Sequence, residues 1–213
     1  MTNSIKMTKL DFMSLKSQHV FFIAALLMIF FGFMNSSFMV MCITAAWYSA
    51  LISTSIFAVQ EKNDMNRLYS SLPISQTNIV LGRYIFMFSV YAISLIIGIA
   101  SYFIFHNGKN RPLELSEFIV GIGISLFISS VIIGIQTPLF FKLGYTKARL
   151  YSMIPFALTI ILTTIPALVK SLIFIFDFLQ GNQIILSISG VIAGAIILFC
   201  SYKISVIAYR KHK

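Results

Sequence analysis

The stretch EFIVGIGISLFISSVIIGIQTPLFF, from Glu117 to Phe141, decides the fold class of this chain. After its first residue it carries no charged side chain. It is long enough for a helix of roughly 20 residues that crosses a hydrocarbon core of about 30 Å. It does not alternate apolar with polar residues in the way a strand of a membrane β-barrel does. The stretch therefore predicts a transmembrane α-helix.

Further runs of the same kind make up most of the chain. Of 213 residues, 58% are hydrophobic and only 10% are charged, whereas about a quarter of the residues of a soluble domain are charged. This composition excludes an ordinary soluble domain. It predicts an all-α integral membrane protein in which residues 1–213 form one transmembrane domain. The six predicted spans are residues 18–34, 38–59, 81–105, 117–141, 151–176 and 184–202.

The positions of the cations predict the orientation of these spans. With both termini in the cytoplasm, most Lys and Arg residues fall on the cytoplasmic side. This agrees with the enrichment of Lys and Arg in the short cytoplasmic loops of proteins that cross the plasma membrane several times. The outer side then holds only Lys109 and Arg111, and Lys170 lies within a span. Because the cations are spread over separated segments, they indicate contact with an anionic inner leaflet, and no nucleic-acid partner is expected. The cytoplasmic set is Lys6, Lys9, Lys16, Lys62, Arg67, Arg83, Lys142, Lys147, Arg149, Lys203, Arg210, Lys211 and Lys213.

Residues that carry chemistry are scattered. The histidines have no cysteine or carboxylate at metal-ligand spacing, so we expect no metal site. The Gly-Lys pair in HNGKNR is followed by Asn110, where a phosphate-binding loop needs Ser or Thr. We therefore expect no catalytic residue, no cofactor bound by this chain and no enzymatic activity of its own. The carboxylates lie outside the predicted spans or at their ends, which disfavours a carrier driven by protons or sodium: Asp11, Glu61, Asp64, Glu114, Glu117 and Asp177.

The longest polar interruption is EKNDMNRLYSSLPISQTNIVLGRY, Glu61 to Tyr84, between the second and third predicted spans. Its residues Met65, Leu68, Tyr69 and Leu72 follow the i, i+3, i+4, i+7 spacing of one helix face, which predicts a short amphipathic helix. Pro73 ends that helix, because its ring clashes with the preceding turn. Two interpretations stay open: the helix lies on the lipid surface, or it fits a groove of a partner protein.

This segment, extended to Ile85, resembles the coupling segment of small six-span permease subunits of type-2 ABC exporters, a group similar to phenol-soluble modulin exporter subunits. The stretch TPLFFKLGYTKARLYSMI, Thr137 to Ile154, resembles the connection between spans four and five in that group. The stretch MTKLDFMSLKSQ, Met7 to Gln18, resembles its N-terminal connecting helix. The apolar residues of that N-terminal helix spread around its circumference, so the sequence indicates no single buried face.

The resemblance implies the partners and the site residues. Two permease copies, or a permease and a sister subunit, form a dimer in the bilayer. Each coupling segment contacts a separate ABC ATPase subunit, which binds the ATP and magnesium. The implied coupling residues are Glu61, Asp64, Met65, Leu68, Tyr69, Leu72 and Pro73, and the implied second cytoplasmic contact is Lys142, Tyr145, Lys147 and Arg149.

The resemblance also implies a function, namely the export of amphipathic, cytolytic or antimicrobial peptides powered by the separate ATPase. The alternative is a membrane sensor or regulatory subunit that transports nothing. Lys170 is the only basic residue well inside a predicted span; it either extends to the outer interface or lines the translocation path. Pro138 lies within the fourth span and frees a backbone carbonyl that a neighbour must satisfy.

Overall fold

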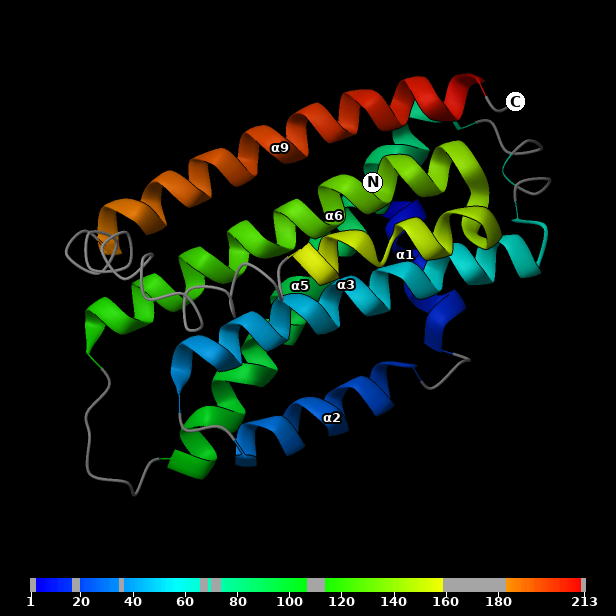
Figure 1. The fold of residues 1–213 in the computed structure, drawn as a ribbon. Coiled ribbons are helices and arrows are strands. Elements are labelled where there is room, and N and C mark those ends of the chain that lie inside the picture. Colours follow the sequence, from blue (N-terminus) through cyan, green and yellow to red (C-terminus); the bar gives the residue numbers. More distant parts are fainter. Residues whose placement is uncertain are drawn as a thin grey trace.

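The computed structural model describes residues 3–16, 20–34, 37–65, 69, 74–106, 114–158 and 183–211. Within these ranges every regular element is a helix, which confirms the predicted all-α class. In Figure 1 α3, α6 and α9 run side by side along an elongated bundle. The helices are α1 (Asn3–Lys16), α2 (Val20–Met34), α3 (Phe38–Lys62), α5 (Gln76–His106), α6 (Leu115–Tyr151) and α9 (Gln183–Lys211).

Among the described residues, α3, α5, α6 and α9 are long and apolar enough to cross a membrane. They correspond to the predicted spans 38–59, 81–105, 117–141 and 184–202. The apolar helix α2 has 15 residues, fewer than the roughly 20 that a span needs, and the start of the predicted span 18–34 lies outside the described residues. The predicted span 151–176 is described only as far as Leu158. A total of six spans therefore stays a prediction.

The connection predicted at residues 142–150 is a tight turn instead of a loop. Helical structure continues on both sides of Gly144, whose φ of 75° and ψ of 169° interrupt α6. Figure 1 shows the chain reversing its direction there, so that its yellow-green part returns alongside α3. A side chain strongly disfavours these angles, and only glycine adopts them at little cost. The sequence predicts the place of the turn, but the connection predicted over residues 142–150 is shorter in the structure, where only Gly144 departs from helical angles.

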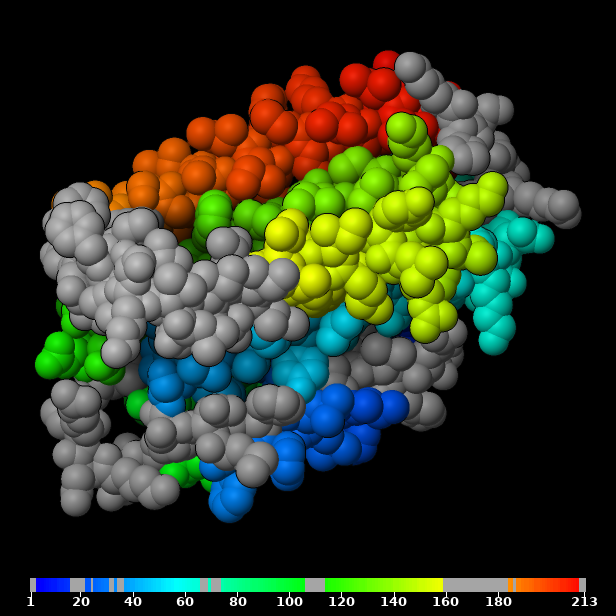
Figure 2. Space-filling view, viewed as in Figure 1, coloured from blue at the N-terminus to red at the C-terminus, as the bar shows by residue number. Residues whose placement is uncertain are grey.

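The packing of α6 against α9 is the most extensive in the bundle. In Figure 2 the orange and red atoms of α9 lie in continuous contact with the green and yellow atoms of α6. Pro138 has no N–H to donate to the carbonyl of Gly134, one turn earlier. That carbonyl instead accepts a hydrogen bond of 2.7 Å from the hydroxyl of Ser201 in α9. The expectation that a neighbour satisfies this carbonyl is thus confirmed.

One face of α1 docks on the start of α5. The hydroxyl of Thr8 donates to the carbonyl of Gly82 at 3.0 Å. A Cβ at Gly82 would lie 2.7 Å from the Cβ of Met7, so the two helices approach too closely for a larger residue. The buried face of α1 mixes polar with apolar side chains at helical spacing, which is why it forms no apolar stripe in the sequence: Ser4, Met7, Thr8, Asp11 and Leu15.

The described cations gather at one end of the bundle, which we call the basic end. This end holds α1, the last turns of α3 and α9, the start of α5 and the turn at Gly144 (Figure 1). Glu114 and Glu117 lie at the opposite end, at the start of α6. This distribution is the one that the predicted topology requires. The exposed cations of the basic end are Lys6, Lys9, Lys62, Lys142, Lys147, Arg149, Lys203 and Arg210.

Candidate functional site

A network of hydrogen bonds and one ion pair lies at the basic end, where α3 ends. We call it the polar junction and define it by Asp11, Gln60, Glu61, Tyr69, Arg83 and Thr146. Its centre is the pair of adjacent residues Gln60 and Glu61, which contact different partners.

Glu61 caps the helical segment that starts after Gly144. Its carboxylate accepts hydrogen bonds from the backbone N–H of Tyr145 at 2.5 Å and of Thr146 at 3.2 Å, and from the Thr146 hydroxyl. The first N–H groups of a helix have no partner within the helix, and a negative charge near them is favourable. An N-cap side chain accepts hydrogen bonds from the first N–H groups of its own helix. Glu61 accepts such bonds from a helical segment that is distant in the sequence. A Cβ at Gly144 would lie 3.1 Å from the Glu61 carboxylate, so this contact also favours glycine.

Arg83 is the centre of the other half of the junction. Its guanidinium lies 3.1 Å from the carboxylate of Asp11, and both side chains are fully buried. The same guanidinium donates hydrogen bonds to the Gln60 side-chain oxygen at 2.6 Å and to the Tyr69 hydroxyl at 3.1 Å. The ring of Phe57 lies beneath the charge, with its centroid 5.4 Å away. Arg83 thus joins α1, α3, α5 and the segment that contains Tyr69.

Asp11 and Arg83 form an ion pair without a hydrogen bond between them. Their contact has the distance of an ion pair but not the geometry of a hydrogen bond, so among the described residues neither carboxylate oxygen has a hydrogen-bond donor. Burial raises the pKa of Asp11 to about 6, although the charge of Arg83 acts in the opposite direction. At neutral pH the carboxylate is therefore ionised and compensates the buried guanidinium. It titrates much closer to neutrality than an exposed aspartate does.

The predicted coupling residues fall into three groups. Glu61 and Asp64 are exposed, and Asp64 adopts a left-handed φ of 48° in the turn after α3. Met65 is half-buried, and Tyr69 is buried beside it with its hydroxyl 3.8 Å from the Met65 sulfur. These two side chains therefore pack on the core of the chain itself. Leu68, Leu72 and Pro73 lie outside the described residues.

The residues of the predicted second contact flank the turn at Gly144. Lys142 precedes it, whereas Lys147 and Arg149 follow it, and all three are exposed. Tyr145 is half-buried, with its ring stacked on Phe140 at a centroid distance of 5.9 Å. Through Glu61 the structure brings this segment to the end of α3. Lys170 lies outside the described residues.

The sequence prediction missed Asp11, Gln60, Arg83 and Thr146 as members of one site. The sequence offered one signal for this site: the predicted topology places Asp11 and Arg83, which carry opposite charges, at the same end of the bundle. Within the described ranges no group of three or more His, Cys, Asp or Glu side chains is placed to hold a metal ion. The hydrogen bonds and the ion pair of the junction hold separate segments of the chain together.

Comparison with known protein families identifies the family of this chain. The family model described as "ABC-2 family transporter protein" matches residues 6–210. No similar curated protein and no similar solved structure was found. The match extends from α1 almost to the end of α9, so it includes every residue of the polar junction.

Proposed function

Because the chain belongs to the ABC-2 transporter family, we propose that it is the permease subunit of an ATP-driven exporter. Permeases of this family generally work with a separate ABC ATPase, which in this proposal holds the ATP and magnesium. The observation that carries the proposal is the polar junction. It ties the polar segment after α3 to the membrane helices through Tyr69 and Arg83, and it ties the turn at Gly144 to α3 through Glu61.

In this proposal the basic end faces the cytoplasm, and both termini lie there. The exposed cations at this end support that orientation, since short cytoplasmic segments are rich in Lys and Arg. The ATPase then contacts the coupling segment from Glu61 to Leu72 through its exposed residues, such as Asp64. Met65 and Tyr69 hold the segment on the bundle from the inside. Lys142, Lys147 and Arg149 form the second contact.

Movement of the coupling segment has two routes into the membrane helices. In the first route, Tyr69 contacts the guanidinium of Arg83 in α5, which pairs with Asp11 in α1. In the second route, Glu61 accepts a hydrogen bond from the helical segment after Gly144. The first route starts at Tyr69 and the second at Glu61, in the last turn of α3, so a push on the coupling segment acts on both sides of the bundle together.

A single chain of six spans leaves little room for a lined path, so the proposal includes a dimer with a second copy or a sister permease. Lys170 is proposed to extend to the outer interface or to line that path. The proposed cargo is an amphipathic peptide, which follows from the resemblance of the coupling segment to that of peptide exporters. The family match does not favour the sensor or regulatory alternative.

The experiment that tests the coupling role compares two aspartate substitutions in the coupling segment. Leu68→Asp places a charge on the predicted apolar face, whose described members Met65 and Tyr69 pack on the bundle, and should displace the segment from the bundle at a cost of a few kcal/mol. Asn66→Asp adds the same charge elsewhere. We expect Leu68→Asp to lose co-purification of the ATPase and peptide export, and Asn66→Asp to keep both. Wild-type association and export in Leu68→Asp, at equal membrane abundance, would reject the coupling role and favour a helix that lies on lipid.

The proposed orientation is tested with single cysteines in a chain without Cys42 and Cys200. An impermeant thiol reagent added outside whole cells should label a cysteine at Glu114 and leave one at Lys147 unlabelled. The two positions lie at opposite ends of α6. Labelling at Lys147 would invert the topology.

A further inference from the structure

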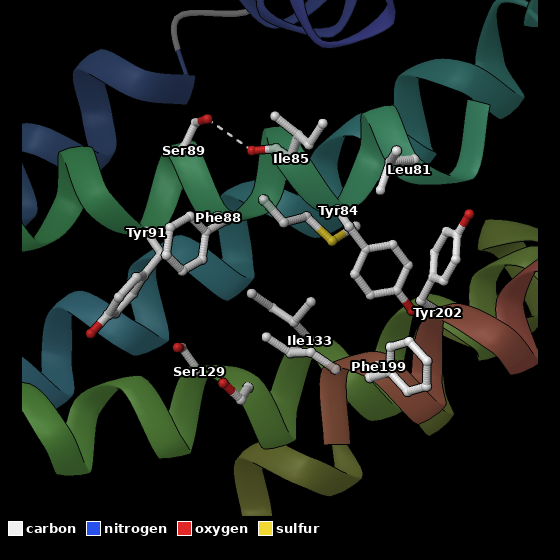
Figure 3. A pocket seen from close by; sticks show the side chains of 13 residues that line it. Leu81, Tyr84, Ile85, Phe88, Ser89, Tyr91, Ser129, Ile133, Phe199 and Tyr202 are labelled. Atoms are coloured by element: carbon white, nitrogen blue, oxygen red, sulfur yellow. Dashed lines mark hydrogen bonds between the residues drawn. The ribbon is translucent and has the colours of Figure 1, made fainter. Parts of the chain in front are cut away.

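A cavity of about 590 Å³ lies between α5, α6 and α9, and none of its lining residues belongs to the polar junction. Figure 3 shows Tyr84, Phe88 and Tyr91 of α5 along one side, Ser129 and Ile133 of α6 facing them, and Phe199 and Tyr202 of α9 at the end beside Tyr84. None of the described residues that line it is charged. The cavity is thus an aromatic and aliphatic groove.

The serine hydroxyls in this groove already donate to backbone carbonyls. Ser89 donates to the carbonyl of Ile85 at 2.8 Å, and Ser129 and Ser130 each donate to the carbonyl of Leu126. A polar solute would therefore find few free partners here. The groove favours an apolar occupant.

The groove opens sideways from the bundle. Phe88 and Phe199, which stand on its two rims, are 55% and 63% exposed. Near the basic end α5 and α9 are joined, because the hydroxyl of Tyr84 hydrogen-bonds with Ser201 at 2.6 Å and with Ser205 at 2.9 Å. The mouth of the groove therefore lies along the sides of α5 and α9, which face the bilayer when these helices cross it.

The groove is elongated. On α5 its lining extends from Leu81 to Tyr91, a rise of about 15 Å. It therefore offers a long apolar surface to an extended chain.

A cation stands at the rim. The ammonium of Lys203 lies 5.5 Å from the centroid of the Phe199 ring, and Lys203 is exposed. Because Phe199 lines the groove, this charge lies beside its mouth, toward the basic end. An apolar chain in the groove would thus end near a positive charge.

We propose that the groove binds one acyl chain of an anionic phospholipid, with the headgroup phosphate beside Lys203. The acyl chain would lie between α5 and α9 and extend from Lys203 away from the basic end. The proposal does not depend on the direction or cargo of transport.

The test uses the full-length protein in vesicles of phosphatidylcholine and phosphatidylglycerol. Either lipid carries a photoreactive diazirine in one acyl chain, and mass spectrometry maps the crosslinks. We expect the phosphatidylglycerol probe to label residues 81–91 and 198–202 more than the exposed apolar face of α2. Labelling that is equal on these surfaces would contradict a site.

Two pairs of variants test the occupant. Ser89→Trp fills the groove and should remove most of this labelling, whereas Ser55→Trp is matched to it, since both hydroxyls bond a carbonyl four residues earlier. Lys203→Gln should lower the preference for phosphatidylglycerol over phosphatidylcholine about fivefold, the factor that about 1 kcal/mol per lysine gives. Lys6→Gln, at another exposed cation of the basic end, should leave the preference unchanged.

Three results would overturn the proposal. The first is full labelling of the groove in Ser89→Trp. The second is equal labelling by the two probes in the wild-type protein, because the site would then not select a negative charge. The third is a disulfide between two copies of a Ser89→Cys variant, because a second copy would then occupy the groove.

Discussion

The carboxylate of Asp11 and the guanidinium of Arg83 lie 3.1 Å apart in a fully buried ion pair that joins α1 to α5. Taking both charges out of water costs several kcal/mol per ion, and their attraction offsets this cost only with additional hydrogen bonds. Arg83 donates such bonds to the side-chain oxygens of Gln60 and Tyr69, whereas Asp11 accepts none from the described residues. The two partners are therefore not equivalent, and their substitutions should differ.

Arg83→Gln should lower the free energy of unfolding by about 3–5 kcal/mol, because it leaves the Asp11 carboxylate buried without a counter-charge. Asp11→Asn should cost less, since Arg83 keeps its bonds to Gln60 and Tyr69. The double variant should be more stable than Arg83→Gln, because the unpaired carboxylate is gone. Thermal unfolding in detergent measures all three. A double variant no more stable than Arg83→Gln would contradict the pairing.

The raised pKa of Asp11, about 6 against 3.8 in the unfolded chain, predicts a dependence of stability on pH. Between these two values the folded protein binds more protons than the unfolded chain, so stability falls as pH rises. The contribution is complete below pH 3.8, is lost as pH passes about 6, and amounts to about 3 kcal/mol. Subtracting the unfolding curve of Asp11→Asn from that of the wild type isolates it. A flat difference from pH 4 to 7 would disprove it.

Glu61→Ala should destabilise the turn at Gly144 by about 1–2 kcal/mol, because the N–H groups of Tyr145 and Thr146 lose their acceptor. Gly144→Ala should cost a further amount of similar size, through backbone strain at its positive φ. Limited proteolysis between residues 142 and 150 reports the opening of the turn. Glu117→Gln, an exposed carboxylate at the opposite end, is the control and should leave cleavage unchanged.

Ser201→Ala should cost about 1–3 kcal/mol, because it leaves the Gly134 carbonyl without a donor inside the bundle. In a Pro138→Ala background the same change should cost less, since residue 138 then has an N–H for that carbonyl. A double-mutant cycle by thermal unfolding measures the difference. Equal costs in both backgrounds would show that Ser201 does not serve this carbonyl.

The membrane helices could be predicted from the sequence because burial in lipid imposes long runs without charges. The spans at 38–59, 81–105, 117–141 and 184–202 follow from that requirement alone. The place of the turn near residue 144 also follows, since the cations of KLGYTKARL interrupt the apolar run. Its tightness does not follow, because it depends on Glu61, a residue from another helix.

Asp11, Gln60, Arg83 and Thr146 could not be predicted as members of the polar junction, because nothing in their local sequence sets them apart before the fold brings them together. By sequence Arg83 is one of many cations that determine topology, and Asp11 is a carboxylate outside the spans. The buried face of α1 contains Ser4 and Thr8, whose hydroxyls bond α5 side chains and carbonyls. A hydrophobic pattern does not detect such a face, because its burial is stabilised by specific hydrogen bonds.

The most direct test of the central claim is photo-crosslinking from the end of α3 in cells that express this chain with an ABC ATPase. A photoreactive amino acid replaces the exposed residue Asp64, and the matched control replaces Glu117 at the opposite end of the bundle. Mass spectrometry identifies the captured protein by its phosphate-binding loop and ABC signature. We predict capture of the ATPase from position 64 and not from position 117. Capture from position 117, or no ATPase at position 64 when both proteins are in the membrane fraction, would contradict the account.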